Sequence, residues 1–397
     1  MSGFIFFIKD IIILIIFGVF SPPTARLYLC TKKDMATSII TDLDYIYLSS
    51  HLPEEVSFET DAASLKIDIY VNNKKVFTSD YYPYSMEVTI RDIRSIVEAA
   101  MISERLSLST LKIVATEPVE QKSNTTYDEN GNIYVNFDEQ PAEPVTETVD
   151  GIKVVFCQFR TSRGSDTFLN QSFLTTRSSV LLPRSGQMKL CHFSKANAHP
   201  KNDVLVYYEE TAHPGRVLTY RYSSTSVQTT VQKVIVTELS HSYFTSIVNK
   251  VNFTGCRVLG VEYRLGNRLI NIFFTDEEPT ATFKFLNAFN IMETAYLFNT
   301  TTIKTDVDRT ETVCGNQTQF YDETVKVRHE VETAPLTHDE AMWLNQMLTS
   351  RLVLKPVDNY DTAQILISDI SSEVSDSDKE LVRIKFSWKY ADGNEWL

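Results

Sequence analysis

The sequence predicts a mainly β, multidomain protein, with antiparallel β-sandwich modules followed by a small C-terminal antiparallel α+β module. Three observations predict this class. The chain has 397 residues, whereas one domain typically holds about 100–200. Aromatic residues make up 11% of the chain and are mostly Phe and Tyr, which favour strands. Short β-branched or aromatic segments recur between turn residues, as is typical of antiparallel sandwiches.

The first segment, residues 1–34, is predicted to be a hydrophobic leader or the product of a misassigned start. Phe4–Phe20 is nearly all apolar, and Lys9–Asp10 interrupts it. The uninterrupted part, Ile11–Phe20, has the length of a signal-peptide core and is too short to cross a bilayer. Three interpretations stay open: translation from Met35, a cleaved signal peptide, and a retained anchor.

Residues 35–118 are predicted to form a β-sandwich with one helix. Leu65–Val71 alternates between apolar and polar residues, the period of a half-buried strand, and the following Asn72-Asn73 predicts a turn. The helix is expected after Thr89 as N-cap, since apolar residues from Ile93 to Met101 share one helical face. Further strands are expected over Val76–Tyr84 and Leu111–Ala115.

Residues 119–150 are predicted to be an acidic, proline-containing linker, and residues 151–335 one or more β-sandwich domains. The second region is expected to begin after a turn at Asp150-Gly151. A hairpin is predicted around Gly266-Asn267. The strands expected in this region are Ile152–Phe159, Val204–Tyr208, Val217–Tyr222, Val231–Leu239, Cys256–Arg264 and Leu269–Phe274.

Residues 336–397 are predicted to be the C-terminal α+β module. Thr337 and Glu340 have the spacing of a capping box, followed by an apolar helical face. A strand is expected over Gln364–Asp369. From Val382 to Tyr390, large apolar residues alternate with polar ones, which predicts a strand with one core face and one basic, solvated face.

The five cysteines and five Asn-x-Ser/Thr sequons carry little information about the compartment. The cysteines are widely spaced and odd in number, unlike those of a disulfide-stapled secreted scaffold, so isolated buried thiols are expected. The sequons matter only if the chain enters a glycosylating compartment. The cysteines are Cys30, Cys157, Cys191, Cys256 and Cys314, and the sequons begin at Asn124, Asn170, Asn252, Asn299 and Asn316.

The candidate chemical groups all have simpler explanations. No nucleophile elbow, Walker loop, dinucleotide fingerprint or His-Glu-x-x-His motif occurs. Cys191, His192 and His199 lack a closing pair of metal ligands, and are interpreted as a strand cysteine with surface histidines. The carboxylates of Asp276–Glu278 and of Asp306 and Asp308 could host an acid/base pair or a cation. They are interpreted as solvated turns.

Tyr81-Tyr82-Pro83-Tyr84 allows two interpretations: an aromatic binding patch, or a strand edge that packs under the first helix. The second is preferred. No catalytic, cofactor-binding or metal-binding residue is therefore assigned, and the chain is expected not to be an enzyme and to need no cofactor. The net charge of −13 argues against nucleic acid as a partner and against an anionic membrane surface.

Several segments resemble β-rich structural proteins encoded in prophages and mobile elements of gut Bacteroidetes, of the tail or baseplate type. The resemblance lies in sequence features in a fixed order and covers about two thirds of the chain. Asn290 stands where such proteins tend to have Gly, and Asn also tolerates a left-handed backbone. The segments are Tyr81–Met101, Phe285–Thr294, Lys304–Arg309, Ala334–Thr337 with the helix after it, Ile367–Asp369 and Phe386–Gly393.

The resemblance implies a non-enzymatic structural or assembly protein of a phage-like particle that acts through protein–protein interfaces. Its partners would be other subunits, including further copies in a homo-oligomer, and its location a virion-like particle, or the cytoplasm before assembly. The alternative is a secreted or envelope-anchored, adhesin-like β-sandwich protein with a cleaved signal peptide. No membrane contact is expected of the mature form unless the leader is retained.

Overall fold

The structure is a computed structural model, and it confirms a mainly β chain with several antiparallel sheets and four helices in its described part. The described residues are 3–8, 11–16, 28–31, 37–118, 123–127, 133–137, 144–225, 230–250, 255–358, 361–372 and 381–393. Met35 lies outside them, as do residues 119–122, 128–132 and 138–143 of the predicted linker. Within residues 1–34, three strands form one antiparallel sheet: β1 (Gly3–Ile8), β2 (Ile11–Ile16) and β3 (Tyr28–Thr31).

The chain divides into two compact units that are discontinuous in sequence. One contains residues 1–45, 53–97 and 110–152, and the other residues 46–52, 98–109 and 153–397. The domain boundaries expected from the sequence stay predictions.

The first unit contains most of one antiparallel sheet and a smaller second one. In the larger sheet, the neighbours are β8 (Lys74–Tyr81), β7 (Leu65–Val71), β10 (Leu108–Thr116) and β13 (Thr146–Val155). The second sheet contains β4 (Ser38–Ile39), β6 (Val56–Glu59) and β9 (Glu87–Ile90). A separate hairpin contains β11 (Ser123–Tyr127) and β12 (Ile133–Phe137).

The predicted elements of this unit are largely confirmed. The strand at Leu65–Val71 is present as expected. Its turn places both Asn72 and Asn73 at positive φ, 50° and 64°, the conformation that a two-residue hairpin loop requires. Helix α1 spans Ile93–Ser103; on its predicted apolar face, Ile93, Val97 and Met101 are buried, and Ile96 and Ala100 are half-buried.

Two local predictions in this region are wrong. Thr89 does not cap α1 but lies in strand β9, where its hydroxyl shares a 2.9 Å hydrogen bond with that of Ser57. The chain does not turn at Asp150-Gly151, because β13 continues through both residues. Gly151 takes a φ of +82° there, which glycine adopts without steric cost, so the strand bends without ending.

The second unit begins with β5 (Ile46–Leu48) and a 3₁₀ turn (Ser49–His51); β5 pairs in parallel with Lys153–Val155. A five-stranded sheet and a two-stranded sheet then enclose a core with helix α3 (His241–Asn249). The five-stranded sheet has the order β14 (Ser179–Pro183), β20 (Arg268–Thr275), β19 (Cys256–Leu265), β16 (Lys201–Glu210) and β17 (Val217–Thr225). The two-stranded sheet contains β15 (Gln187–Ser194) and β18 (Lys233–Ser240).

A short helix, α2 (Ser165–Gln171), packs its buried Phe168 and Leu169 into a separate core cluster. The predicted hairpin around Gly266-Asn267 is confirmed, since Leu265 pairs directly with Arg268. The strands expected at 204–208, 217–222, 231–239, 256–264 and 269–274 are all present, most of them longer than predicted.

The last sheet of this unit has seven strands, and helix α4 (His338–Leu348) shares its core. The predicted capping box is confirmed: the Thr337 N–H donates to Glu340 Oε2 over 3.0 Å, and the Glu340 N–H donates to Thr337 Oγ1 over 3.4 Å. The strands, in spatial order, are β22 (Met292–Leu297), β21 (Ala281–Leu286), β25 (Val353–Pro356), β26 (Thr362–Ser371), β27 (Lys385–Tyr390), β24 (Gln317–Thr333) and β23 (Asn299–Cys314). The sheet thus joins the C-terminal elements to strands that precede residue 336.

The alternation predicted for the last strand is also confirmed. The apolar residues Val382, Ile384, Phe386, Trp388 and Tyr390 are all buried, whereas the basic residues between them are exposed. Asn290 has the predicted left-handed backbone, with a φ of 55°. Its side-chain amide donates to the Leu106 carbonyl over 3.2 Å.

Candidate functional site

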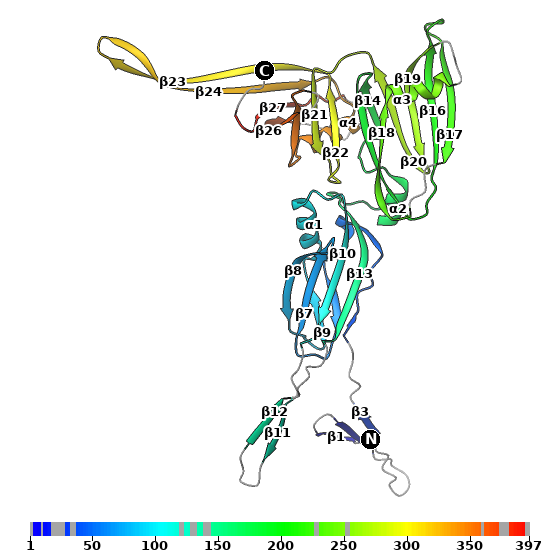
Figure 1. The fold of residues 1–397 in the computed structure, drawn as a ribbon, viewed down its shortest axis with the longest axis vertical. Coiled ribbons are helices and arrows are strands. Elements are labelled where there is room, and N and C mark those ends of the chain that lie inside the picture. The colour runs from blue at the N-terminus through cyan, green and yellow to red at the C-terminus, as the bar shows by residue number, and fades with distance from the viewer. Residues whose placement is uncertain are drawn as a thin grey trace. The chain divides into compact units, whose positions relative to one another are not determined.

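The second unit carries a long β-hairpin built from β23 and β24, which we call the arm (Figure 1). Its strands have 16 and 17 residues. Only the root of the arm joins the sheet, because β24 pairs with β27 over His329–Glu332 alone. From Thr305 to Val327, no other strand of the described chain is paired with either side of the hairpin.

The arm has one apolar face and one charged face. Residues directly opposite each other in an antiparallel pair share a face, and Val307 lies opposite Val325. Two more apolar residues lie on the same face, Ile303 and Val327. Ile303, Val307 and Val325 are 63%, 43% and 51% exposed. We call these four residues the apolar stripe.

The other face of the arm holds exposed ion pairs. Lys326 lies 3.2 Å from Asp308, and Lys304 lies 2.6 Å from Glu330. Arg328 reaches Asp369 of β26 over 3.0 Å. Each such exposed pair contributes at most about 1 kcal/mol, so the pairs favour solubility and register more than stability.

The apolar stripe continues the core face of the seven-stranded sheet. Val331 and His329 precede it on β24 with the same alternation, and both are buried against the last strand. Beyond His329, Val327 is half-buried and Val325 is exposed. The sequence therefore keeps a core-like pattern where the described chain provides nothing to cover it.

The tip of the arm is aromatic. The pairing register shifts between Thr310 and Glu311, and Phe320 and Tyr321 beyond it are exposed. The Arg309 guanidinium lies 4.8 Å from the centre of the Phe320 ring and also pairs with Glu323 over 3.0 Å. An isolated two-stranded hairpin is only marginally stable in water, so an exposed apolar face on such a hairpin is typical of a segment that is buried in an assembly.

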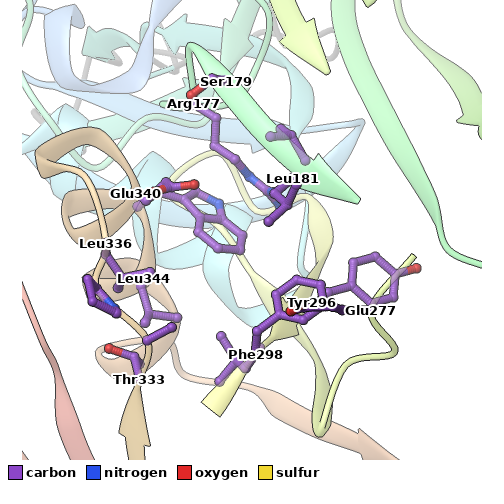
Figure 2. A pocket seen from close by; sticks show the side chains of 15 residues that line it. Arg177, Ser179, Leu181, Glu277, Tyr296, Phe298, Thr333, Leu336, Glu340 and Leu344 are labelled. Atoms are coloured by element: carbon purple, nitrogen blue, oxygen red, sulfur yellow. The ribbon is translucent and has the colours of Figure 1, made fainter. Parts of the chain in front are cut away.

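A pocket of about 220 Å³ lies beside the root of the arm (Figure 2). Tyr296 and Phe298, just before β23, lie on one side of it in this view, and Leu336 and Leu344 lie on the other. Glu340 and the exposed Glu277 add carboxylates to the lining. These walls suit an apolar side chain with a cationic or hydrogen-bond-donating end.

Arg177, which lines this pocket, belongs to a buried ion pair. Arg177 Nη2 lies 3.1 Å from Glu293 Oε2, and the guanidinium lies 3.4 Å from the centre of the Trp343 ring. The Glu293 carboxylate also accepts hydrogen bonds from Trp343 Nε1 over 2.7 Å and from the Asn287 amide over 2.6 Å. Burial lowers the pKa of Arg177, and the Glu293 carboxylate opposes this shift. The polar groups of this network are paired with one another. The network therefore holds β22, α4 and the segment before β14 together and has a structural role.

The two groups of carboxylates that were predicted to lie in solvated turns lie in different kinds of secondary structure. Asp276–Glu278 follows β20 and is exposed as expected, and Asp276 pairs with Arg184 over 2.8 Å. Asp306 and Asp308 do not lie in a turn; they lie within β23 on the charged face of the arm. Neither group is part of a cluster of three or more possible metal ligands, and the described residues contain no such cluster.

The Cys191–His192 prediction is partly wrong. Both residues lie in β15 as expected of a strand, but His192 is buried and only His199 is exposed. The four cysteines whose side chains are described are free thiols: Cys157 and Cys191 are buried, Cys256 is half-buried and Cys314 is exposed at the tip of the arm.

The preferred interpretation of Tyr81–Tyr84 is also wrong for two of its tyrosines. Tyr82 and Tyr84 are 79% and 87% exposed and do not pack under the first helix. They lie in a tight turn in which Tyr84 pairs with Glu87, and Ser85 and Met86 take positive φ. The turn directs the chain back into β9 without providing any core against which the rings could pack.

Comparison with known proteins gives no relative: no family model, curated protein or solved structure matches this chain. Among the described residues, no helix is long and apolar enough to span a membrane. The arm itself was not predicted from the sequence. Its signal was present, because Val325, Val327, His329 and Val331 alternate with charged residues, and the opposite strand contains Ile303 and Val307.

Proposed function

We propose that this chain is a non-enzymatic structural subunit of a larger assembly, of the tail or baseplate type in a phage-like particle, and that the arm is its joining element. The observation that carries the proposal is the apolar stripe on a hairpin that no other described part of the chain covers. The assignment to a phage-like particle rests on the sequence resemblance.

The physical reason for assembly is the free energy of burying the stripe. Burial of apolar surface contributes about 25 cal/mol per Å², and a ribbon that lies on a neighbour also reduces its own fraying. The outer edge of β23 presents backbone N–H and C=O groups that no strand of the described chain pairs, and such an edge is a template for another chain.

The partner we propose is a second copy of this chain. An identical copy supplies an identical stripe, so packing the two stripes together removes both from water. A contact between the arm and a different surface of the next copy would instead repeat around a ring. Both arrangements place the stripe in an interface, and both fail when it is made polar.

The test compares two double variants of the full chain. Val307→Lys/Val325→Lys places charge on the stripe, and Thr310→Lys/Thr324→Lys places the same charge on the opposite face of the same hairpin. All four positions are exposed. Lysines at 307 and 325 are direct cross-strand partners and repel each other by about 0.2–1 kcal/mol, whereas each lysine of the threonine variant lies opposite an aspartate. Hydrogen exchange of the arm amides therefore checks that the hairpin is formed in both variants. Light scattering after size-exclusion chromatography gives the mass of each species over a range of concentrations.

We expect the wild type and the threonine variant to associate and the valine variant to stay monomeric. A wild type that stays monomeric at every concentration contradicts the second copy as partner. Equal association of both variants contradicts the stripe as the interface.

A second candidate function is supported by the exposed turn at Tyr82 and Tyr84. Exposed aromatic rings on a tight turn are typical of contacts with carbohydrate or protein surfaces, as an envelope or secreted binding protein would use. In that case Tyr82→Ala/Tyr84→Ala abolishes binding of the purified chain to glycan-coated surfaces, whereas Val307→Lys/Val325→Lys leaves it unchanged. No binding by the wild type contradicts this function.

A further inference from the structure

A second cavity of the same unit, of about 490 Å³, differs in chemistry from the pocket beside the arm. Its walls come from α2, from the end of β15 and the loop that follows it, and from the turn between β19 and β20. The charged residues that line it, Lys195 and Arg268, are both basic, and no carboxylate side chain is part of the lining.

Arg268 places a positive charge at the wall of this cavity. Its side chain is nearly inaccessible, with the residue only 5% exposed, and burial lowers the pKa of the guanidinium to about 10, which leaves it charged at neutral pH. Nε donates to the Ser172 carbonyl over 3.0 Å, and Nη2 donates to the carbonyls of Phe193, over 2.9 Å, and Leu169.

These three carbonyls orient the guanidinium but do not neutralise it. Leu169 belongs to the last turn of α2 and Ser172 follows it, so Arg268 also satisfies acceptors at a helix C-terminus, where cations are favourable. No carboxylate within the described residues forms an ion pair with Arg268, and Nη1 takes part in none of its hydrogen bonds there. A buried charge that lacks a counter-ion costs several kcal/mol, and an anion in the cavity would offset this cost.

His192 also belongs to the lining of this cavity. It is 3% exposed, and its two ring nitrogens are inaccessible and have no hydrogen-bond partner among the described residues. Burial, together with the charge of Arg268, lowers the pKa of His192 to about 4, so the ring is neutral and adds no charge at the wall. A buried polar group without a partner costs about 1–3 kcal/mol.

The rim of the cavity is polar. Lys195 pairs with Asp166 over 2.6 Å, and the Asn170 amide donates to the same carboxylate over 3.1 Å. His199 and Asn267 also line the cavity. The rim therefore offers hydrogen-bonding groups for a ligand that also carries hydroxyls.

We propose that this cavity binds a small organic oxyanion, with its carboxylate or phosphate group on Arg268 and its remaining polar groups on the rim. Charge-assisted hydrogen bonds of this kind are the strong ones in proteins. The site is independent of the arm and goes beyond the proposed assembly function.

The test is a thermal-shift titration of the full chain at constant ionic strength. The probes are acetate, glucuronate, inorganic phosphate and, as an uncharged control, glucose. We expect a saturable rise of Tm with at least one anion and none with glucose. A rise of Tm with acetate or glucuronate identifies a carboxylate ligand, and a rise with inorganic phosphate identifies a phosphate ligand.

Three variants locate the effect. Arg268→Met is expected to weaken binding by about 10-fold or more, the loss typical of one charge-assisted hydrogen bond. His192→Phe, which changes an inaccessible ring of the wall, and Lys189→Ala, which changes an exposed lysine on the same strand as His192, are expected to bind like the wild type. Should Arg268→Met fail to fold, Arg268→Lys and the shift of the His192 ring signals on titration of the wild type, followed by NMR, decide the question. The absence of a saturable anion effect in the wild type overturns the proposal, as does unchanged affinity in the Arg268 variant.

Discussion

His329 lies flat on Trp388 at the root of the arm, with ring centres 3.9 Å apart and ring planes within 6°. The two residues are directly opposite each other in the β24–β27 pairing. They mark the position at which the arm leaves the core, because residues before His329 on β24 are progressively exposed. The stack therefore fixes the direction in which the apolar stripe is presented.

Replacing His329 by Ala removes this stack from a buried position. We expect the free energy of unfolding to fall by about 1–2 kcal/mol, since aromatic pairs contribute about 0.5–1.5 kcal/mol beyond the area that they bury. His329→Phe keeps a ring against Trp388 and is expected to retain most of the stability. Urea denaturation measures both. Equal losses in the two variants would mean that the ring contact contributes nothing.

Glu293→Leu should be among the most destabilising single changes in the second unit. It leaves buried Arg177 without its counter-ion and removes the acceptor for Trp343 and Asn287. Breaking one partner of a buried ion pair costs about 3–5 kcal/mol. Glu332→Ala, which removes an exposed partner of Lys385, serves as control and should change stability by less than about 1 kcal/mol. The same denaturation curves test this, and a loss for Glu293→Leu no larger than for the control refutes it.

The buried His192 predicts a pH dependence of stability. Its pKa is lowered to about 4 in the folded chain, whereas an unfolded histidine titrates near 6.5. The unfolded state therefore binds the proton first as the pH falls, so stability decreases from about pH 6.5 down to about pH 4. The contribution amounts to about 3 kcal/mol, as 1.36 kcal/mol corresponds to one pKa unit. The difference in unfolding free energy between wild type and His192→Phe, measured across this range, should change with that sign. A pH-independent difference contradicts it.

The thiols should differ sharply in reactivity. Burial raises the pKa of Cys191 to about 11, so this thiol is protonated and inaccessible at neutral pH. Cys314 is exposed at the tip of the arm. The number of thiols that react fast with a thiol reagent in the native protein should be one lower in Cys314→Ser than in the wild type. It should be unchanged in Cys191→Ser. Loss of a fast-reacting group in Cys191→Ser would place that thiol at the surface.

The elements that could be predicted from the sequence are those with a local signal. The alternation from Val382 to Tyr390 and the capping box at Thr337 each depend on residues within a few positions of one another, and both are present. The left-handed backbone at Asn290 was instead expected from the resemblance, together with the tolerance of Asn for that conformation. Thr89 has the local spacing of a helix cap but lies in β9, because pairing with β6 satisfies its backbone groups.

The features that could not be predicted depend on contacts between distant parts of the chain. Arg177 and Glu293 are far apart in sequence, and no spacing rule links them. The cavity at Arg268 needs α2, β15 and a hairpin turn to meet. The arm was missed for a different reason: its charged residues and threonines conceal an alternation whose apolar half is not buried by this chain.

We propose above that the apolar stripe builds this chain into a particle. The most direct measurement is quantitative mass spectrometry of density-banded particles from cells that express, from the native locus, the wild type, Val307→Lys/Val325→Lys or Thr310→Lys/Thr324→Lys. We expect the wild type and the threonine variant to band with particles, whereas the valine variant is folded but stays at the top of the gradient. Absence of the wild-type chain from the particle band, or equal recovery of all three chains there, would contradict it.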